Sequence, residues 1–181
     1  MVKDKVDVKL ALKIIALVVF LGWLIRLLVF ATIEIDGPSM EPTLTRGERI
    51  LIEKFSYQIS EPARFDIIVF QATEEKNYIK RIIGLPGEKI VMEDDQLYIN
   101  DQPIREPFLT VQDYSFNFTN DFRLNNLPGR HHVIPEDYYL VLGDNRINST
   151  DSRSLGLIAK QQIIGKASIR YWPLRQISFI E

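Results

Sequence analysis

The chain has 181 residues, of which 46% are hydrophobic and 25% charged, a composition typical of one folded domain with an appendage and not of a disordered protein. It contains no cysteine, so a disulfide framework, a thiolate zinc site and a cysteine nucleophile are excluded. The formal net charge is −2, and five of the 22 basic residues but only two of the 24 acidic residues precede residue 34. The remainder of the chain is therefore acidic, which argues against nucleic acid as a partner.

The first predicted element is an apolar helix at residues 14–33, whose only charge is Arg26. At about 1.5 Å per residue, a helix of this length spans roughly 30 Å, enough to cross a bilayer once. Four lysines precede it, which predicts a cytoplasmic tail at 1–13 and an extracytoplasmic location for the rest of the chain. Arg26 is expected to snorkel to the interface or else to make a functional contact within the membrane.

A cleaved signal peptide is the alternative for this segment. Val29 and Ala31 stand two apart, like the small-residue pair of a cleavage site. The apolar run is longer than the usual signal-peptide core of about 7 to 15 residues, which favours a retained transmembrane anchor.

Composition changes where the anchor ends, since all nine prolines and eight of the nine glycines lie from Gly37 onward. Short runs rich in β-branched and aromatic residues follow, each bounded by turn residues, as is typical of antiparallel strands. The predicted fold class is therefore mainly β, a single transmembrane helix followed by a largely antiparallel β domain at 34–181. Residues 112–132 are predicted to form a long excursion or loose hairpin, and 154–165 a helical turn or short helix. Strands are predicted at 49–54, 65–70, 78–84, 88–92, 96–100, 138–144 and 165–173.

Two residues in these elements are candidates for catalysis. Lys80 shares a strand face with Tyr78, and burial against apolar surface would lower its pKa from about 10.4 toward the working pH, so that the neutral amine can act as a general base. The alternative is an edge cation whose stem lies over apolar surface. Ser39, which follows Gly37 in a constrained turn, is the nucleophile that such a base would activate.

A third polar stretch, "GDNRINSTDSR" at 143–153, comes directly after an apolar strand. Opposite charges alternate along it, which suggests an Asp-Arg network that fixes the shape of a loop. A solvated loop is the alternative.

The stretches "GPSMEPTL", "RFDIIVF", "YIKRIIGLPGE" and "GDNRINSTDSR", in this order after one anchor, resemble the signature boxes of the type I signal peptidases. The resemblance implies a Ser-Lys dyad, with Ser39 as the nucleophile and Lys80 as the general base. It implies a serine endopeptidase, anchored in the cell membrane and in contact with its lipid, that removes signal peptides from secretory preproteins. No metal or cofactor is implied, and the single span and compact domain look like the small Gram-positive form.

The resemblance also implies supporting features: pockets for small side chains at the first and third positions before the cut, and an apolar rim near Met40 that rests on the membrane. Some members carry a serine at the position of Gly37 whose hydroxyl supports the oxyanion, so the second donor here is an open question. Supporting roles are implied for Ser149, which would orient the lysine amine, for the pair Asp151 and Arg153, and for Asp144 and Arg146 in the same scaffold.

Three rival interpretations are weaker. A Ser-His-Asp hydrolase would need His131 or His132, but these adjacent histidines fall in a predicted loop and "GPSME" is not the G-x-S-x-G turn. A self-cleaving Ser-Lys repressor peptidase would be soluble and carry a DNA-binding domain. A membrane-anchored β module that only binds a partner, or an inactive relative, would not need both Ser39 and Lys80.

Overall fold

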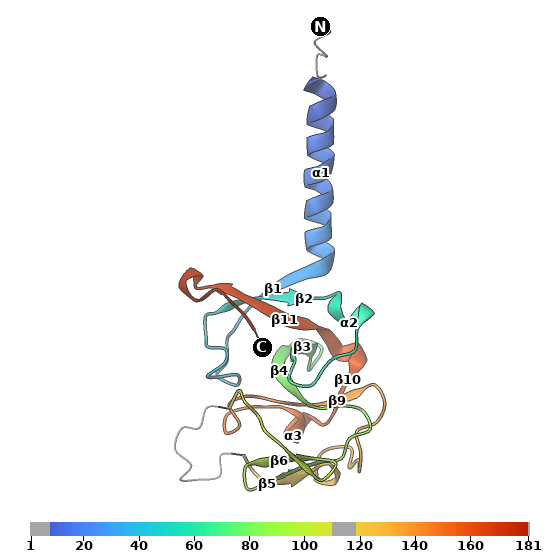
Figure 1. Ribbon diagram of the computed structural model, residues 1–181, viewed down its shortest axis with the longest axis vertical. Coiled ribbons are helices and arrows are strands. Elements are labelled where there is room, and N and C mark those ends of the chain that lie inside the picture. Colours follow the sequence, from blue (N-terminus) through green and yellow to red (C-terminus); the bar gives the residue numbers. More distant parts are fainter. Residues whose placement is uncertain (1–7, 110–118, 181) are drawn as a thin grey trace.

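The computed structural model describes residues 8–109 and 119–180. Helix α1 (Val8–Val29) projects from a β domain, and strand β1 (Phe30–Glu34) follows it directly (Figure 1). The helix predicted at 14–33 thus ends at Val29, because β1 pairs in antiparallel register with β2 (Arg49–Glu53). Across the described ranges, no helix is both long enough and apolar enough to cross a membrane. Residues 1–7 of the predicted tail and the side chain of Arg26 lie outside the described part of the chain.

The larger sheet has eight strands in the order β1-β2-β11-β3-β4-β9-β10, with β12 paired to β11. Every strand pair in the described residues is antiparallel, so the prediction of a largely antiparallel β domain is confirmed. Besides β1 and β2, the strands of this sheet are β3 (Ile67–Gln71), β4 (Asn77–Gly84), β9 (Tyr138–Leu142), β10 (Ile158–Ala159), β11 (Ile163–Trp172) and β12 (Ser178–Phe179).

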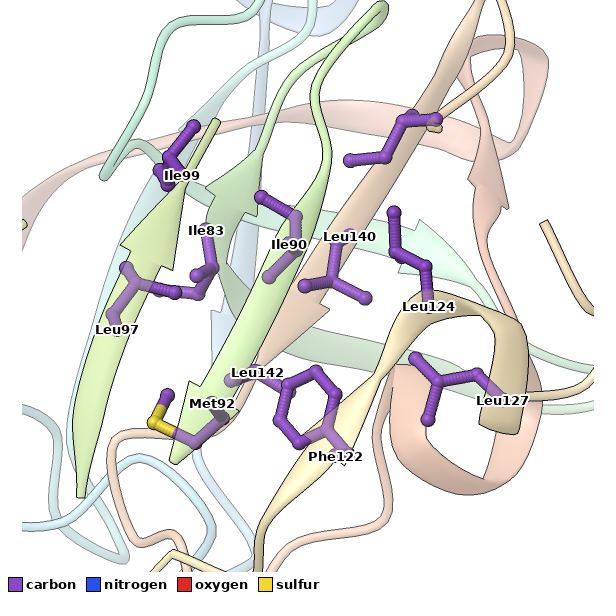
Figure 2. Close-up of a cluster of buried hydrophobic side chains, with 11 residues drawn as sticks. Ile83, Ile90, Met92, Leu97, Ile99, Phe122, Leu124, Leu127, Leu140 and Leu142 are labelled. Atoms are coloured by element: carbon purple, nitrogen blue, oxygen red, sulfur yellow. The ribbon is translucent and has the colours of Figure 1, made fainter. Parts of the chain in front are cut away.

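A smaller sheet of four strands lies at the end of the domain away from α1 (Figure 1). A core of aliphatic side chains packs between this sheet and β4 and β9 of the larger one, with Ile83, Leu140 and Leu142 on one side and Ile90 and Leu97 on the other (Figure 2). The strands of the smaller sheet are β7 (Gln102–Ile104), β6 (Gln96–Ile99), β5 (Ile90–Glu93) and β8 (Phe122–Arg123).

The excursion predicted at 112–132 falls partly outside the described residues, which resume at 119. From there the chain forms β8 and the 3₁₀ turn η1 (Leu124–Asn126), and Phe122, Leu124 and Leu127 pack into the same core (Figure 2). The described part of the excursion is therefore a covering layer of the domain.

The helical turn or short helix predicted within 154–165 is present as two one-turn pieces separated by a short strand. Helix α3 (Ser152–Leu155) ends at Gly156, whose φ of 84° stops the helix, and β10 and the 3₁₀ turn η2 (Lys160–Gln162) follow. Two further short elements, α2 (Ser56–Ile59) and η3 (Leu174–Gln176), flank β2 and β11.

A second apolar cluster lies beneath the turn that carries Ser39. Met40 and Leu44 are fully buried there, against Ile50, Ile52 and neighbours on the larger sheet. Fully burying such side chains contributes about 1.5–3 kcal/mol each, which holds the turn to the sheet. Met40 itself therefore faces the core and does not belong to the apolar rim expected near it.

Candidate active site

The loop between β1 and β2 presents Ser39 at the surface of the domain. Leu44 N–H donates to Met40 O at 2.9 Å and Glu41 N–H to Pro38 O at 3.1 Å, so the segment forms consecutive tight turns. The buried side chains of Met40 and Leu44 hold the turn from below, while Ser39 is partly exposed. Local hydrogen bonds and core packing together fix the backbone on either side of the serine.

Lys80 comes to this serine from the middle of β4. The residue is 3% exposed, and its Nζ lies 2.7 Å from Ser39 Oγ and 2.8 Å from Ile79 O. The ring of Tyr78, two residues earlier on the same strand face, has its centroid 5.3 Å from Nζ. No carboxylate among the described residues forms an ion pair with Nζ. The structure thus brings together the two residues that the sequence nominates as a dyad, 41 positions apart.

The electrostatics of Lys80 are those of a base that works near neutral pH. Burial lowers the pKa of its amine from 10.5 to about 8, and the charges of Asp151 and Asp144 oppose this shift without cancelling it. Desolvation penalises the ammonium form because apolar surroundings replace water around the charge. A usable fraction of the amine is therefore neutral at physiological pH, and it already lies at hydrogen-bond distance from the hydroxyl.

Arg81, the next residue on β4, binds a carboxylate that the sequence places in the third polar stretch. Its Nε and Nη2 lie 2.9 and 2.8 Å from the two oxygens of Asp144, and both side chains are 1% exposed. Arg81 also donates to Phe65 O at 2.9 Å and stacks 3.9 Å above the Phe108 ring. Asp144 accepts a further bond from Thr43 Oγ1 at 2.6 Å. This buried pair is bidentate and its remaining polar atoms have partners, as a buried pair requires.

The loop at 143–153 wraps around the Ser39 turn. Asn145 N–H donates to Ser39 O at 3.1 Å, and its side-chain amide donates to Pro38 O at 3.2 Å. At the other end of the loop, Asp151 accepts from Gly143 N–H at 3.0 Å and from Arg153 Nε and Nη2 at 2.8 Å each. Burial would raise the pKa of the Asp151 carboxyl, but the Arg153 guanidinium and the Gly143 amide hold it below its ordinary value.

Asp144 and Arg146 do not bind each other, although the alternating charges suggested one network. Arg146 instead pairs with Glu106 and donates to Gly143 O at 3.0 Å. Two ion pairs therefore fasten the loop to other parts of the domain, Asp144 to Arg81 and Arg146 to Glu106, while Asp151 and Arg153 pair within it.

Ser149 lies beside the dyad without reaching it. Its Oγ is buried and has no hydrogen-bond partner among the described residues, so the contact with the Lys80 amine that the resemblance implies is not formed here. A Cβ placed on Gly143 would lie 2.3 Å from Ser149 Oγ and 2.4 Å from Ser39 O. Only glycine fits there, and its absent side chain lets the loop approach the serine.

A groove of about 670 Å³ opens in front of the two residues. One wall is the end of β1 and the Ser39 turn, and the other is the start of β4, with Val69 of β3 between them. Gly37 and Asn148 also line the groove. Ser39 and Lys80 therefore line a depression that a ligand can enter.

Comparison with known proteins agrees with this geometry. Residues 8–172 match the family model of signal peptidase, peptidase S26. The chain belongs to this family. It is 42% identical over 158 residues to signal peptidase I of Bacillus caldolyticus, covering 86% of each chain, and 40% identical over 154 residues to signal peptidase IB of Staphylococcus aureus strain MRSA252, covering 80% of this chain and 79% of that one.

A crystal structure of a signal peptidase I from Enterococcus faecalis V583 is also similar to this S26 chain. It superposes with a TM-score of 0.56 at 39% sequence identity, covering 61% of this chain and 99% of that one. The family predicted from the four sequence boxes is therefore confirmed, together with a fold of the signal peptidase I type.

Sequence reasoning missed three residues that shape the S26 site. Arg81, Thr43 and Asn145 were not singled out from the sequence. Their roles depend on contacts across 63, 101 and 107 positions of sequence. The signal that was available is the doublet Lys80-Arg81, because a strand that buries both faces must give each cation its own partner.

Proposed function

We propose that this protein is a membrane-associated serine endopeptidase that removes signal peptides from secretory preproteins, with Ser39 as nucleophile and Lys80 as general base. Membership of the signal peptidase family supports the substrate class and the reaction. The observation that carries the residue assignment is the 2.7 Å contact between Lys80 Nζ and Ser39 Oγ at the groove.

In the proposed reaction, neutral Lys80 takes the Ser39 proton as Oγ attacks the carbonyl carbon of the scissile peptide bond. The lysine ammonium then gives this proton to the leaving amine, and the mature protein departs from an acyl-enzyme ester. A water molecule attacks the ester while Lys80 takes its proton, and the proton returns to Ser39 as the signal peptide leaves. One base thus serves both halves of the reaction.

The groove suits an extended peptide. Across the described strands, β1 pairs only with β2, and β4 pairs with β9 only from Arg81 onward. The end of β1 and the residues before Lys80 therefore keep one backbone edge each toward the groove, and an extended chain between them gains hydrogen bonds on both sides. Ile33, Ile35, Val69 and Ile79 supply an apolar lining, which favours small apolar side chains next to the cut.

We further propose that α1 is a membrane anchor, with residues 1–13 on the cytoplasmic side and the catalytic β domain outside, this domain beginning at β1 and not at residue 34. In support, large apolar side chains along α1, among them Leu17, Val19 and Phe20, are more than half exposed. Exposed apolar residues also lie on α2 and β11, near the α1 end of the domain (Figure 1). Alkaline carbonate should leave the protein in the membrane pellet, and protease added outside intact cells should remove the β domain. Release by carbonate would contradict the anchor.

The catalytic assignment is tested by cleavage of a preprotein in detergent. Ser39→Ala and Lys80→Ala should each abolish detectable cleavage, because one removes the nucleophile and the other its base. Ser60→Ala and Lys54→Ala are matched controls on exposed residues outside the groove lining and should cut at the wild-type rate. Full activity of either dyad variant would overturn the assignment, and a wild-type protein that cuts no preprotein would overturn the function.

A further inference from the structure

A second route of polar contacts joins the strand that carries Lys80 to the loop that carries Ser39. Arg81 binds both oxygens of Asp144, and Thr43 Oγ1 donates to Asp144 Oδ2 at 2.6 Å. Arg81 directly follows Lys80 in β4, and Thr43 lies four residues after Ser39. The path from Arg81 through Asp144 to Thr43 therefore runs alongside the direct contact between the dyad residues.

The Thr43 bond is not needed to neutralise Asp144. Arg81 already supplies two charge-assisted bonds to this carboxylate, whose side chain is 1% exposed. The Thr43 hydroxyl is neutral and adds no opposite charge. What it adds is a fixed point for the loop, because the carboxylate of Asp144 is itself held by two bonds to Arg81 of β4. Core packing of Met40 and Leu44 fixes the depth of the loop against the sheet. The bond from Thr43 to Asp144 fixes the position of the loop relative to the strand that carries Lys80.

We propose that Thr43 is a positioning residue for the peptidase reaction, whose hydroxyl sets the separation of Ser39 Oγ and Lys80 Nζ by tying the loop to Asp144. The inference rests on the proposed function of the dyad and concerns the same reaction. Proton transfer needs donor and acceptor within about 2.6–3.2 Å. A displacement near 1 Å in such a contact can cost about 10²-fold in rate.

The same loop contains a matched control. Thr45 Oγ1 donates to Glu48 Oε1 at 2.9 Å, and Arg170 Nη1 donates to the same oxygen at 2.8 Å. This is again a threonine, a buried carboxylate and an arginine, but Arg170 lies on β11, whereas Lys80 lies on β4. Arg170 Nη1 also reaches Thr43 O at 3.5 Å. Removing the Thr45 hydroxyl breaks a bond of the same segment but leaves the bond from Thr43 Oγ1 to Asp144 in place.

The test measures kcat and KM for one preprotein with the full chain in detergent, alongside the thermal midpoint. Thr43→Val keeps the shape and loses the hydroxyl, and we expect kcat to fall roughly 10-fold while KM changes less than about 2-fold. Thr43→Ser restores the hydroxyl and should recover most of kcat. Thr45→Val should keep kcat within about 2-fold of wild type even where its thermal midpoint falls as far as that of Thr43→Val.

Three outcomes would overturn the proposal while the wild type still cuts: unchanged kcat in Thr43→Val, no recovery in Thr43→Ser, or equal kcat losses in Thr43→Val and Thr45→Val. If Thr43→Val does not fold, Thr43→Ala is assayed and judged by the same criteria. A wild type that does not cut contradicts the proposed function instead, so the two failures are distinguishable.

Discussion

The two faces of strand β4 carry neighbouring cations in contrasting surroundings. Lys80 and Arg81 are equally buried, at 3% and 1% exposure, and point to opposite sides of the strand. Arg81 meets the carboxylate of Asp144, a backbone carbonyl and the face of an aromatic ring. Lys80 meets a hydroxyl, a backbone carbonyl and an aromatic ring, and Asp144 acts on it only at longer range.

The difference shows how a strand can make one buried cation structural and the next one reactive. Desolvation disfavours both charges, but a bidentate carboxylate compensates that of Arg81, and the guanidinium cannot lose its proton in a protein. No such contact compensates Lys80, whose amine can lose a proton, so the pKa falls to about 8. The Arg81 face therefore holds the fold, and the Lys80 face is available for chemistry.

The largest expected effect is a difference in stability between variants of the two strand faces. Arg81→Met leaves Asp144 buried without its cation and should lower the free energy of unfolding by about 3–5 kcal/mol. Lys80→Met removes a buried amine that has no contacting carboxylate, so it should unfold at the same or a higher urea concentration than wild type while losing cleavage. Urea unfolding of both variants at neutral pH makes the comparison. Equal losses of stability would contradict the contrast between the faces.

The second prediction concerns how the ionisation of Lys80 makes the stability of the protein depend on pH. Its pKa in the folded protein, about 8, lies below the ordinary value of 10.5 that applies to the unfolded chain. Between these values the unfolded chain binds more protons, so this group makes stability rise with pH, and its cost to folding is fully present below about pH 8. Lys80→Met lacks this cost. Its stability advantage over wild type should be greatest at neutral pH and shrink as the pH rises from about 8 to 10.5 in urea unfolding series. A constant difference would mean that burial does not lower the pKa.

Sequence alone predicted the architecture well where patterns are local. The seven predicted strands correspond to β2, β3, β4, β5, β6, β9 and β11. Strand β1 was missed because the apolar run of the helix continues through Ile33, and nothing in hydropathy marks the point where pairing with Arg49–Glu53 takes over from the helix. The short strands β7, β8, β10 and β12 were missed because two or three residues carry no periodicity.

Ser39 and Lys80 were nominated because their residue types and their boxes carry the chemistry, whereas the supporting contacts depend on tertiary structure. The pair Asp151 and Arg153 lies two residues apart and was implied by the family resemblance. Asp144 and Arg146 bind Arg81 and Glu106, which lie 63 and 40 positions away. The pattern of charges along the chain does not predict pairs at such a separation. The burial of Met40 was not predicted for the same reason, since the residue after the partly exposed Ser39 turns into the core.

The smallest expected effect concerns the groove side of the dyad. Gly37 lines the groove, and a Cβ at this position would meet nothing within 4 Å, so a side chain fits without displacing its neighbours. Gly37→Ser would place a hydroxyl two residues before the nucleophile, where it can join the Ser39 N–H in stabilising the oxyanion. A single donor of this kind is worth about 10² to 10³ in rate where it is native and well aligned. An introduced hydroxyl has no prepared geometry, so we expect a several-fold rise in kcat with little change in KM.

Gly37→Ala is the control, because it adds the Cβ without the hydroxyl and should not show the rise. Equal rates in the two variants would mean that the hydroxyl does not reach the oxyanion and that backbone donors already stabilise it.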